Sequence, residues 1–430
     1  MKNSKKRKIT LERYFYPVGQ GLCCRERFIF NDEIDETTGK PKEFNLVYDC
    51  GGSSYNFAKC FDIQQKNRSS RFPYPCISSF IANKLKGLKI DILCISHLHD
   101  DHINLLQDLK KFRCQTMHIV LPYISKTDLF WNLLDPKIEN NETSMRLLGL
   151  ASGFLQSESD TRVYRLLPKD IKKDSNEKEI KNKYVIESGT DLLNKFGYFD
   201  VSNFWQYPHY NYHINLSELD KIYRHLIDNI APKVFTDLGA FIECRDNIQK
   251  EYSRIHPTRG GLLIEDNPPR GRYFNEQSTV LFSIPKKKIS PTISFDEIKR
   301  DITHSTEICY GCNFSLKYYK VPLIHNIKQP GCIYLGDYLA ANSSFYHNLK
   351  QEIDIYKEKI YTIQMPHHGS KNGLFTDGFY KDRVCVIPYG LRNGYSHPHK
   401  IVQETIKKDQ GIRVNVTEEA GYVQHFEFTV

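Results

Sequence analysis

The chain of 430 residues exceeds the usual size of a single domain, so we expect either two domains or one domain with a large insertion. A hydrophobic content of 40% and an aromatic content of 13% exclude a generally disordered protein. The 60 Lys and Arg residues exceed the 51 Asp and Glu residues and give a net charge of +9, which favours polyanionic partners without requiring them.

The start of the chain and the cysteines indicate a compartment. No run of about 18 apolar residues is present, and the basic segment 1–8 leads into 9–13 rather than into the hydrophobic part of a secretion signal. The 12 cysteines are scattered singly, several within apolar, strand-like runs, as is typical of reduced cysteines in intracellular proteins. We therefore expect a cytoplasmic protein without membrane insertion.

The first part of the chain alternates between strands, turns and a helix. The pattern of apolar residues predicts, in order, strands at 14–18, 22–30 and 45–48, a helix at 76–86 and a buried strand at 90–95. The turn Gly19-Gln20-Gly21 joins the first two strands into a hairpin, and the third strand ends at Asp49 before two glycines. This order of elements favours an α/β architecture.

Residues from about 155 to 270 differ in character and predict an insertion of mixed helix and loop. They include a highly charged stretch at 169–178, which is more typical of a solvated face than of a binding tail, and a predicted helix at 217–229. Strand-like runs resume at 277–282, 315–319 and 332–337. We therefore expect 1–430 to form one domain, with 155–270 as a lid or an interaction region within it.

A histidine-rich segment directly follows the strand at 90–95. The segment His97-Leu98-His99-Asp100-Asp101-His102 holds three imidazoles and two carboxylates. These groups are the usual ligands of zinc and related divalent ions, and a tight loop after a rigid strand can hold them in place at little ordering cost. A structural metal site would more often use cysteines, and a surface loop would more often contain Lys and Ser. The segment therefore predicts a metal site.

The pattern His97-x-His99-x-Asp101-His102 resembles the HxHxDH signature of the metallo-β-lactamase fold. The order of the other motifs resembles the hydrolase domain of ComEC-type DNA-uptake proteins, and these motifs are Val18-Gly19-Gln20-Gly21, Tyr48-Asp49-Cys50-Gly51, Gly336-Asp337, Pro366-His367-His368-Gly369-Ser370, Tyr395-Ser396-His397-Pro398 and 417–422. The matching regions cover about 14–122 and 275–430. The resemblance implies an αββα sandwich, in which two mixed sheets pack face to face with helices outside and a two-ion site at one edge.

The resemblance also implies a set of ligands for two divalent ions, Zn²⁺ or Mn²⁺. The ligands would be His97 and His99 for the first ion, Asp101, His102 and His368 for the second, and Asp337 as a bridge between both. His367 is the less favoured alternative to His368. Asp49 matches an acid at a strand end that supports the metal loop by hydrogen bonding rather than by ligation.

One ligand of the first ion is not assigned by any motif. The family commonly supplies a further histidine from a loop between the HxHxDH motif and the bridging aspartate. We favour His209 for this role, with His213 second, while His256 and the absence of any such ligand stay open. Without this ligand the first site would be weaker, or would prefer manganese to zinc.

The expected chemistry follows from the two ions, which together make a bridging water more acidic and neutralise charge on the attacked group. Such a centre suits phosphodiesters, because both ions stabilise the charge on the phosphoryl oxygens. We therefore predict a metal-dependent phosphodiesterase or nuclease that acts on DNA or RNA mainly through phosphate contacts. The catalytic residues would be Asp101 together with His367 and His397, two candidates for protonating the leaving group or contacting phosphate.

Two alternative functions remain. The same site could hydrolyse a small phosphorylated, ester, lactone or lactam molecule, with 155–270 as a lid over it. The chain could also be a metal-binding regulatory subunit of a larger complex, although the complete set of predicted metal ligands argues against this. The sequence lacks the membrane channel of ComEC proteins, so a free-standing hydrolase, with a possible protein partner that supplies substrate or control, is expected.

Overall fold

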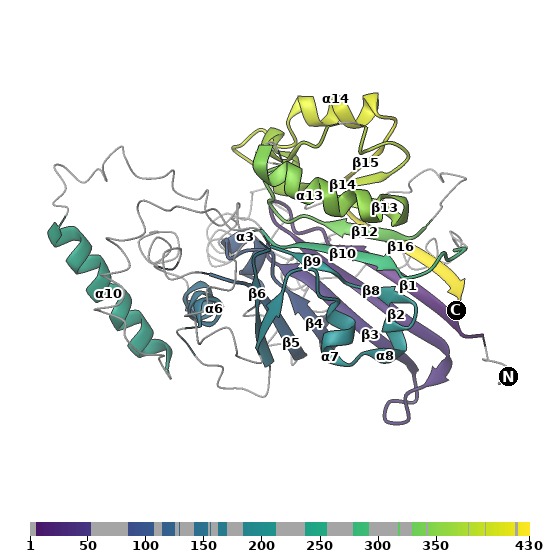
Figure 1. Ribbon diagram of the computed structural model, residues 1–430, viewed down its shortest axis with the longest axis horizontal. Coiled ribbons are helices and arrows are strands. Elements are labelled where there is room, and N and C mark those ends of the chain that lie inside the picture. Colours follow the sequence, from purple (N-terminus) through teal and green to yellow (C-terminus); the bar gives the residue numbers. More distant parts are fainter. Residues whose placement is uncertain are drawn as a thin grey trace, which may run out of the picture.

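The computed structural model describes much of the chain, namely residues 6–52, 85–106, 114–124, 129, 142–153, 155, 162–169, 184–211, 237–255, 278–291, 317–318, 329–340, 343–376, 378–391, 393–417 and 420–430. These residues form a mixed α/β structure built on two β-sheets (Figure 1). The sequence analysis predicts this mixed architecture, and the structure confirms it at that level.

The larger sheet has nine strands among the described residues. Its first two strands form the predicted antiparallel hairpin, in which Arg13 lies opposite Glu26. In spatial order the strands are β11 (Lys317–Tyr318), β16 (Ala420–Thr429), β1 (Lys8–Phe15), β2 (Cys23–Ile34), β3 (Pro41–Cys50), β4 (Lys89–Cys94), β5 (Gln115–Pro122), β6 (Arg162–Leu167) and β7 (Val185–Glu187). The first and last long strands of the chain, β1 and β16, are therefore neighbours.

The smaller sheet has seven strands within the described ranges. In spatial order they are β15 (Ile412–Val416), β14 (Val384–Pro388), β13 (Ile360–Gln364), β12 (Gly331–Tyr334), β10 (Val280–Pro285) and β8 (Trp205–Gln206), with β9 (His209–Tyr210) also paired to β10. The strands β12 to β15 are parallel, whereas β10 is antiparallel to β12. The strands predicted at 277–282 and 332–337 correspond to β10 and β12.

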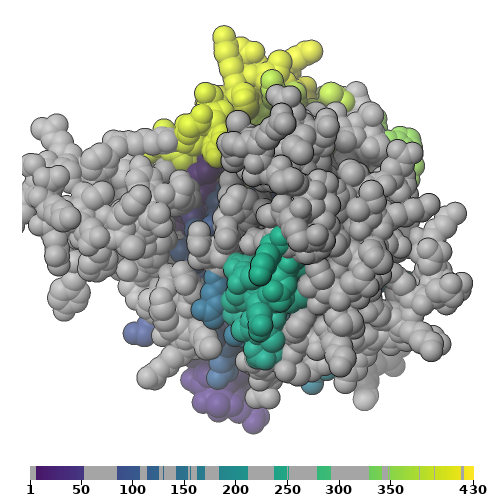
Figure 2. Space-filling model, turned by 90° about the vertical axis from the view of Figure 1, so that its left-hand side faces the viewer, coloured from purple at the N-terminus to yellow at the C-terminus, as the bar shows by residue number. Residues whose placement is uncertain are grey.

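Three hydrophobic clusters show the order of the layers. The helices α6 (Glu142–Ser152) and α10 (Leu238–Ile255) share one cluster with the outer face of the larger sheet. The helices α13 (Ser343–Tyr356) and α14 (Lys400–Lys408) share another with the outer face of the smaller sheet, and the remaining cluster lies between the two sheets. In the space-filling view, α10 lies at the surface below the yellow C-terminal segment (Figure 2). The order is thus helix, sheet, sheet, helix.

Strand β14 illustrates how the sequence produces these layers. Successive side chains of a strand point to opposite faces, so a strand that is buried on both sides is apolar throughout. Val384 and Val386 face the cluster between the sheets, and Cys385 and Ile387 face α13 and α14. Every helix in the described part of the chain is too short or too polar to cross a membrane.

The remaining described helices are short. They are α3 (Asp100–Ile103), α7 (Leu192–Phe196), α8 (Phe199–Ser202) and the 3-10 helices η2 (Lys357–Lys359), η3 (Pro366–Gly369) and η4 (Lys371–Gly373). Helix α7 begins at Asp191, whose side chain accepts a hydrogen bond from the amide of Leu193, and it ends at Gly197 with a left-handed φ of 79°. Helices α3 and η3 carry residues of the predicted metal site.

Part of the segment 155–270, which the sequence predicts as an insertion, belongs to the two sheets. Strands β6 and β7 extend the larger sheet, and β8 and β9 join the smaller one. The predicted helix at 217–229, most of that at 76–86 and nearly all of the charged stretch at 169–178 lie outside the described residues. The division of the chain into a core domain and an insertion therefore stays a prediction.

A buried ion pair connects the two sheets. Arg13 on β1 and Glu26 on β2 are both fully buried, and Arg13 Nε donates to Glu26 Oε1 at 2.6 Å. Three hydroxyl groups from the smaller sheet and the loop beside it also donate to Glu26, and they belong to Tyr207 (2.6 Å), Ser283 (2.6 Å) and Tyr334 (2.9 Å). A buried charge is tolerated only when it is paired and fully hydrogen-bonded, and this network meets both conditions.

The guanidinium of Arg13 extends the same network across the sheets. Its Nη1 donates to Gln424 Oε1 on β16 at 2.9 Å, and its Nη2 donates to the carbonyl of Pro330, just before β12, at 3.1 Å. The amide of Gln424 in turn donates to Thr362 Oγ1 on β13 at 2.9 Å. The network therefore includes residues of β1, β2 and β16 on one side and of β10, β12 and β13 on the other.

Replacing Glu26 by glutamine tests how strongly this network stabilises the fold. The substitution leaves the charge of Arg13 buried without a carboxylate, so we expect the free energy of unfolding, measured in urea, to fall by about 3–5 kcal/mol. The matched control is Glu43→Gln, which removes a partly exposed partner of Arg27 and should cost about 1 kcal/mol or less. Equal losses of stability in the two variants would contradict the role assigned to Glu26.

Candidate metal centre

The predicted metal ligands leave the carboxyl ends of parallel strands in both sheets. His97, Asp101 and His102 follow β4 of the larger sheet, whereas Asp337 follows β12 and His368 follows β13 of the smaller sheet. Strands of one parallel array end at the same edge, so loops that follow them are brought together. Residues more than 200 positions apart in the sequence thereby meet at one place.

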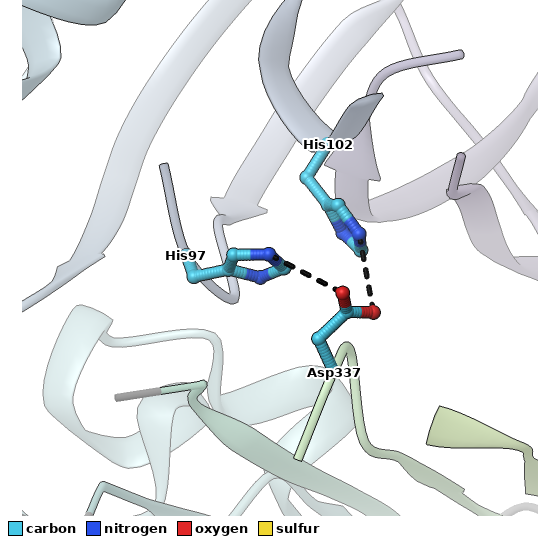
Figure 3. A group of neighbouring side chains, drawn as sticks. All are labelled: His97, His102 and Asp337. Carbon is cyan, nitrogen blue, oxygen red and sulfur yellow. Dashed lines mark ion pairs between the residues drawn. The ribbon is translucent and has the colours of Figure 1, made fainter. Parts of the chain in front are cut away.

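Three buried side chains form the first group of possible ligands (Figure 3). Asp337 Oδ2 lies 3.7 Å from His97 Nε2, and Asp337 Oδ1 lies 3.3 Å from His102 Nε2. His102 Nε2 and Asp337 Oδ1 are buried and have no hydrogen-bond partner within the described part of the chain. Imidazole nitrogens and carboxylate oxygens that converge in this way are arranged as ligands are around an ion, although the same atoms also form ion pairs when the histidines are protonated.

A second group of possible ligands shares His102 with the first. It consists of Asp101, His102 and His368, and as in the first group the ligand atoms lie within 4.8 Å of one another. His368 Nε2 lies 3.2 Å from Asp101 Oδ2 and 3.9 Å from Asp337 Oδ1. The two carboxylate oxygens of Asp337 thus face different histidines. Imidazole nitrogens and carboxylate oxygens in this number fit divalent ions such as zinc and manganese.

The other proposed ligands of the first ion lie outside both groups. His99 Nδ1 is 3.1 Å from His97 Nε2, but among the described residues His99 belongs to neither group. His209 is buried on β9, also in neither group, and burial lowers its pKa to about 3. His213 and His256 lie outside the described residues. The further ligand of the first ion therefore stays a prediction.

Asp49 holds the metal loop in place through hydrogen bonds to Ser96 and His102. This fully buried residue is the next to last of β3, and its Oδ1 accepts a hydrogen bond from the backbone amide of Ser96 at 2.6 Å. Its Oδ2 accepts one from Ser96 Oγ at 2.6 Å and lies 2.8 Å from His102 Nδ1. Such a contact fixes the orientation of the imidazole and leaves its Nε2 for the ion. Asp49 is thus a hydrogen-bonding residue in the structure, as the resemblance implies.

Two serines that the sequence analysis does not identify contact the first histidine of the motif. Ser96 Oγ lies 2.9 Å from His97 Nδ1, and Ser278 Oγ lies 3.3 Å from the same atom. Ser96 immediately precedes the motif, and this position is the one feature of the sequence that could have indicated a contact with His97. Ser278 lies far away in the sequence, just before β10, and no pattern distinguishes it from other serines.

The charges in the centre favour a cation. Burial opposes the charged form of His102, but the carboxylates of Asp337 and Asp49 outweigh this effect and hold its pKa well above the usual value. Burial likewise opposes ionisation of Asp337, yet the neighbouring His367 and His102 hold its pKa well below the usual value. The carboxylate of Asp337 is therefore ionised at neutral pH, which suits the binding of metal ions.

The turn after β13 directs two consecutive histidines to different places. His367, His368 and Gly369 all have left-handed backbone angles, with φ of 49°, 55° and 79°. Non-glycine residues adopt this conformation at a cost of about 1–3 kcal/mol each, and such strain concentrates at functional sites. The Nδ1–H of His368 donates to the carbonyl of Pro388 at 3.0 Å, and its Nε2 points toward Asp101 Oδ2 at 3.2 Å.

The predicted catalytic histidines lie beside the second group. The ring centroid of His397 is 6.3 Å from that of His368 and 5.5 Å from that of His367. The Nδ1 atoms of His367 and His397 are buried and have no hydrogen-bond partner in the described ranges. Burial, together with the neighbouring imidazole of His368, lowers the pKa of His397 to about 3. Both imidazoles therefore have a nitrogen available for a bound molecule.

Glycines allow the metal loop to lie directly on the backbone of neighbouring turns. A Cβ atom at Gly51 would lie 2.4 Å from backbone atoms of Asp101 and His102. A Cβ atom at Gly336, which has a φ of 54°, would lie 2.6 Å from Ser96 Cβ. Both distances are far shorter than a van der Waals contact, so a larger residue at either position would displace the loop.

The substitution Gly51→Ala tests this close packing. The added methyl group would displace Asp101 and His102, so we expect the free energy of unfolding to fall by about 1–3 kcal/mol and the bound metal per chain to decrease. The control is Gly239→Ala on α10, where the added atom meets only the end of a side chain at 3.2 Å. Elemental analysis and urea unfolding measure the two effects, and full metal content in Gly51→Ala would contradict the assigned packing.

The substitution Asp49→Asn tests the support of His102 separately from the fold. It removes the charge next to His102 Nδ1, so we expect affinity for Mn²⁺ or Zn²⁺ to fall about 10- to 100-fold in a competition titration with a chelating dye. Asp91→Asn is the matched control, because Asp91 is also a buried carboxylate but accepts from the amide of Asn45 on β3. If both variants bound metal equally, Asp49 would have no supporting role.

Comparisons with known proteins give little further information. Neither protein-family models nor curated proteins show a match to this sequence. Among solved structures, a long form RNase Z from yeast is similar to this chain, with a TM-score of 0.29 and 9% sequence identity. The match covers 89% of this chain and 36% of the yeast chain. The likeness is too distant to assign a function, so the proposal below depends on the geometry of the metal centre.

Proposed function

We propose that this protein is a metal-dependent hydrolase that cleaves phosphodiester bonds in nucleic acid. The observation that carries the proposal is the convergence of buried ligand atoms from both sheets into two groups that share His102. His102 Nε2 and Asp337 Oδ1 lie 3.3 Å apart in that space and have no hydrogen-bond partner elsewhere among the described residues. Bringing two carboxylates and three imidazoles this close together away from water is costly, and bound divalent ions would offset that cost.

The layer order supports a metallo-β-lactamase fold, resembling the ComEC-type hydrolase domain, as the framework of this centre. The described residues form helix, sheet, sheet and helix layers, which is the αββα order that the sequence motifs imply. The His97–His102 loop follows a strand of one sheet, and Asp337 and His368 follow strands of the other. Motif order and layer order thus agree for this centre.

Two divalent ions, zinc or manganese, are the proposed cofactors. His97 with His102 and Asp337 would hold one ion, and Asp101 with His368 would hold the other beside the shared residues. Ions bound in this centre would make water a stronger acid and offset negative charge on the reacting group. His99 and the further histidine remain candidates for completing the first set.

The chain itself supplies positioning and hydrogen bonds. The hydrogen bond from His368 to the carbonyl of Pro388 and the contact between Asp49 and His102 hold the ligands in place before substrate arrives, which lowers the reorganisation needed in the transition state. His367 and His397 lie beside His368 and have buried Nδ1 atoms without partners in the described ranges. We assign to these imidazoles hydrogen bonds to a phosphoryl oxygen or to the leaving group.

Nucleic acid is the proposed substrate because of its charge and its bond type. The net charge of +9 attracts a polyphosphate, and contacts to phosphate would be tolerant of sequence and sensitive to salt. A centre that offsets charge on phosphoryl oxygens suits a phosphodiester, because negative charge builds up on those oxygens in the transition state.

The test combines metal removal with one substitution in the centre. We expect the protein loaded with manganese or zinc to cleave single- or double-stranded DNA or RNA, and chelation to abolish cleavage until metal is restored. Asp337→Asn should lower kcat/KM at least about 100-fold, because Asp337 faces both ligand groups. Asp354→Asn on the exposed side of α13 is the control and should leave kcat/KM unchanged.

The panel of substrates also separates the alternatives. Hydrolysis of bis-p-nitrophenyl phosphate without cleavage of any nucleic acid would favour a small-molecule substrate. Less than one ion per chain after incubation with several metals would favour a regulatory subunit. Cleavage by Asp337→Asn at the parent rate would show that the chemistry takes place elsewhere.

A further inference from the structure

A series of three rings leads from the metal centre to the surface. The ring of His397 lies 6.3 Å from that of His368, with 29° between the planes, and the ring of Tyr395 lies 5.7 Å from that of His397, with 26° between the planes. His368 is buried in the centre, whereas Tyr395 is 66% exposed. The stack therefore ends in an aromatic side chain that is mostly in solvent.

The sequence segment that carries Tyr395 is rich in exposed apolar side chains compared with the rest of the described residues. Seven large ones are exposed, and three of them, Leu391, Tyr395 and Ile401, lie within 391–401. The other four are dispersed along the chain at Ile34, Met117, Phe199 and Ile355.

The loop that carries Tyr395 is held in place by hydrogen bonds. Asn393 Oδ1 accepts from the amides of Tyr395 at 3.1 Å and His397 at 2.9 Å, and Asn393 Nδ2 donates to the carbonyls of Gly390 and His397. The amide of Gly390 donates in turn to Gln20 Oε1, in the turn of the first hairpin, at 3.2 Å. Tyr395 is therefore presented on an ordered loop, which lowers the entropic cost of binding to it.

Basic residues adjoin the same loop. The amide of Lys371 donates to His399 Nδ1 at 3.1 Å, and the His399 ring lies 4.9 Å from that of His397. Lys400 follows directly in the sequence, and its side chain is 89% exposed. Proteins bind single-stranded nucleic acid by stacking bases on exposed aromatic rings and contacting phosphates with cations, and this segment offers an exposed ring together with lysines, of which Lys400 also lies 3.6 Å from Glu404.

We propose that Tyr395 is a stacking platform for one unpaired nucleobase of a single strand whose backbone enters the metal centre. The inference rests on the proposed function and narrows its substrate class to single-stranded nucleic acid, because the faces of bases in a duplex are already covered by their neighbours. The ring-to-ring steps are 6.3 and 5.7 Å. At a rise of about 3.4 Å per nucleotide, the stacked base lies within about four nucleotides of the scissile bond.

The substitution Tyr395→Ala tests the platform on a single-stranded oligonucleotide labelled at one end. Loss of one stacked base should raise KM about 5- to 100-fold, with a smaller change in kcat, whereas Tyr395→Phe keeps the ring and should restore KM. Phe199→Ala on α8 is the matched control, since Phe199 is an aromatic residue of similar exposure, 65%, and should leave KM at the parent value. An unchanged KM in Tyr395→Ala would overturn the proposal.

Oligonucleotides with single abasic positions identify the stacked base. Removing the base that stacks on Tyr395, within about four nucleotides of the cleavage site, should raise the KM of the parent protein as much as Tyr395→Ala does. It should not raise the KM of Tyr395→Ala any further. If Tyr395→Ala raised KM by the same factor on a fully abasic strand as on a normal one, the ring would not act by stacking.

Binding and cleavage together distinguish this inference from the proposed function. Fluorescence anisotropy with the Asp337→Asn variant measures binding of the labelled strand without turnover. If the parent protein cleaves the strand, and Tyr395→Ala does not weaken binding when both forms carry Asp337→Asn, only the stacking platform is overturned. The same result is expected if the surface around Tyr395 binds another protein instead. A protein that hydrolyses a small diester but neither binds nor cleaves any strand would overturn both proposals.

Discussion

The interaction on which the rest of the structure depends is the set of hydrogen bonds to the buried carboxylate of Glu26. The carboxylate accepts hydrogen bonds from Arg13 within the larger sheet and from Tyr207, Ser283 and Tyr334 on the side of the smaller one. A charge this deeply buried is stable only when its partners occupy fixed positions, so few relative arrangements of the two sheets satisfy it. Because the ligand groups draw residues from both sheets, the same contact limits how far those residues can separate.

Much of the candidate centre can be predicted from the sequence because its residue types are concentrated in short motifs. The His97–His102 segment, Asp337 and His368 are recognisable from their order, and the structure brings members of all three together. The contacts that align them are less visible. Nothing in the sequence shows that the serine before the motif would bond to Asp49, because serine is common in loops of every kind.

The fold shows the same division between pattern and context. The apolar pattern predicts seven strands, whereas the described residues form sixteen, and it would place Arg13 and Glu26 in water, since charged residues on a strand usually face solvent. They are buried because a second sheet covers that face. The strands within 162–210 are short and lie beside the charged stretch at 169–178. The charged residues indicate an insertion more strongly than the short apolar runs indicate strands.

The pairing of β1 with β16 has a consequence for the order in which the molecule assembles. Arg13 and Gln424 are hydrogen-bonded although 411 residues separate them, and Lys8 lies opposite Thr429. Contacts between such distant segments form late and slowly, because the intervening chain must first be brought into place. During synthesis, one edge of β1 therefore stays unpaired until β16 has left the ribosome. That edge is a place where a nascent chain can pair with a second chain, and so a hazard of aggregation.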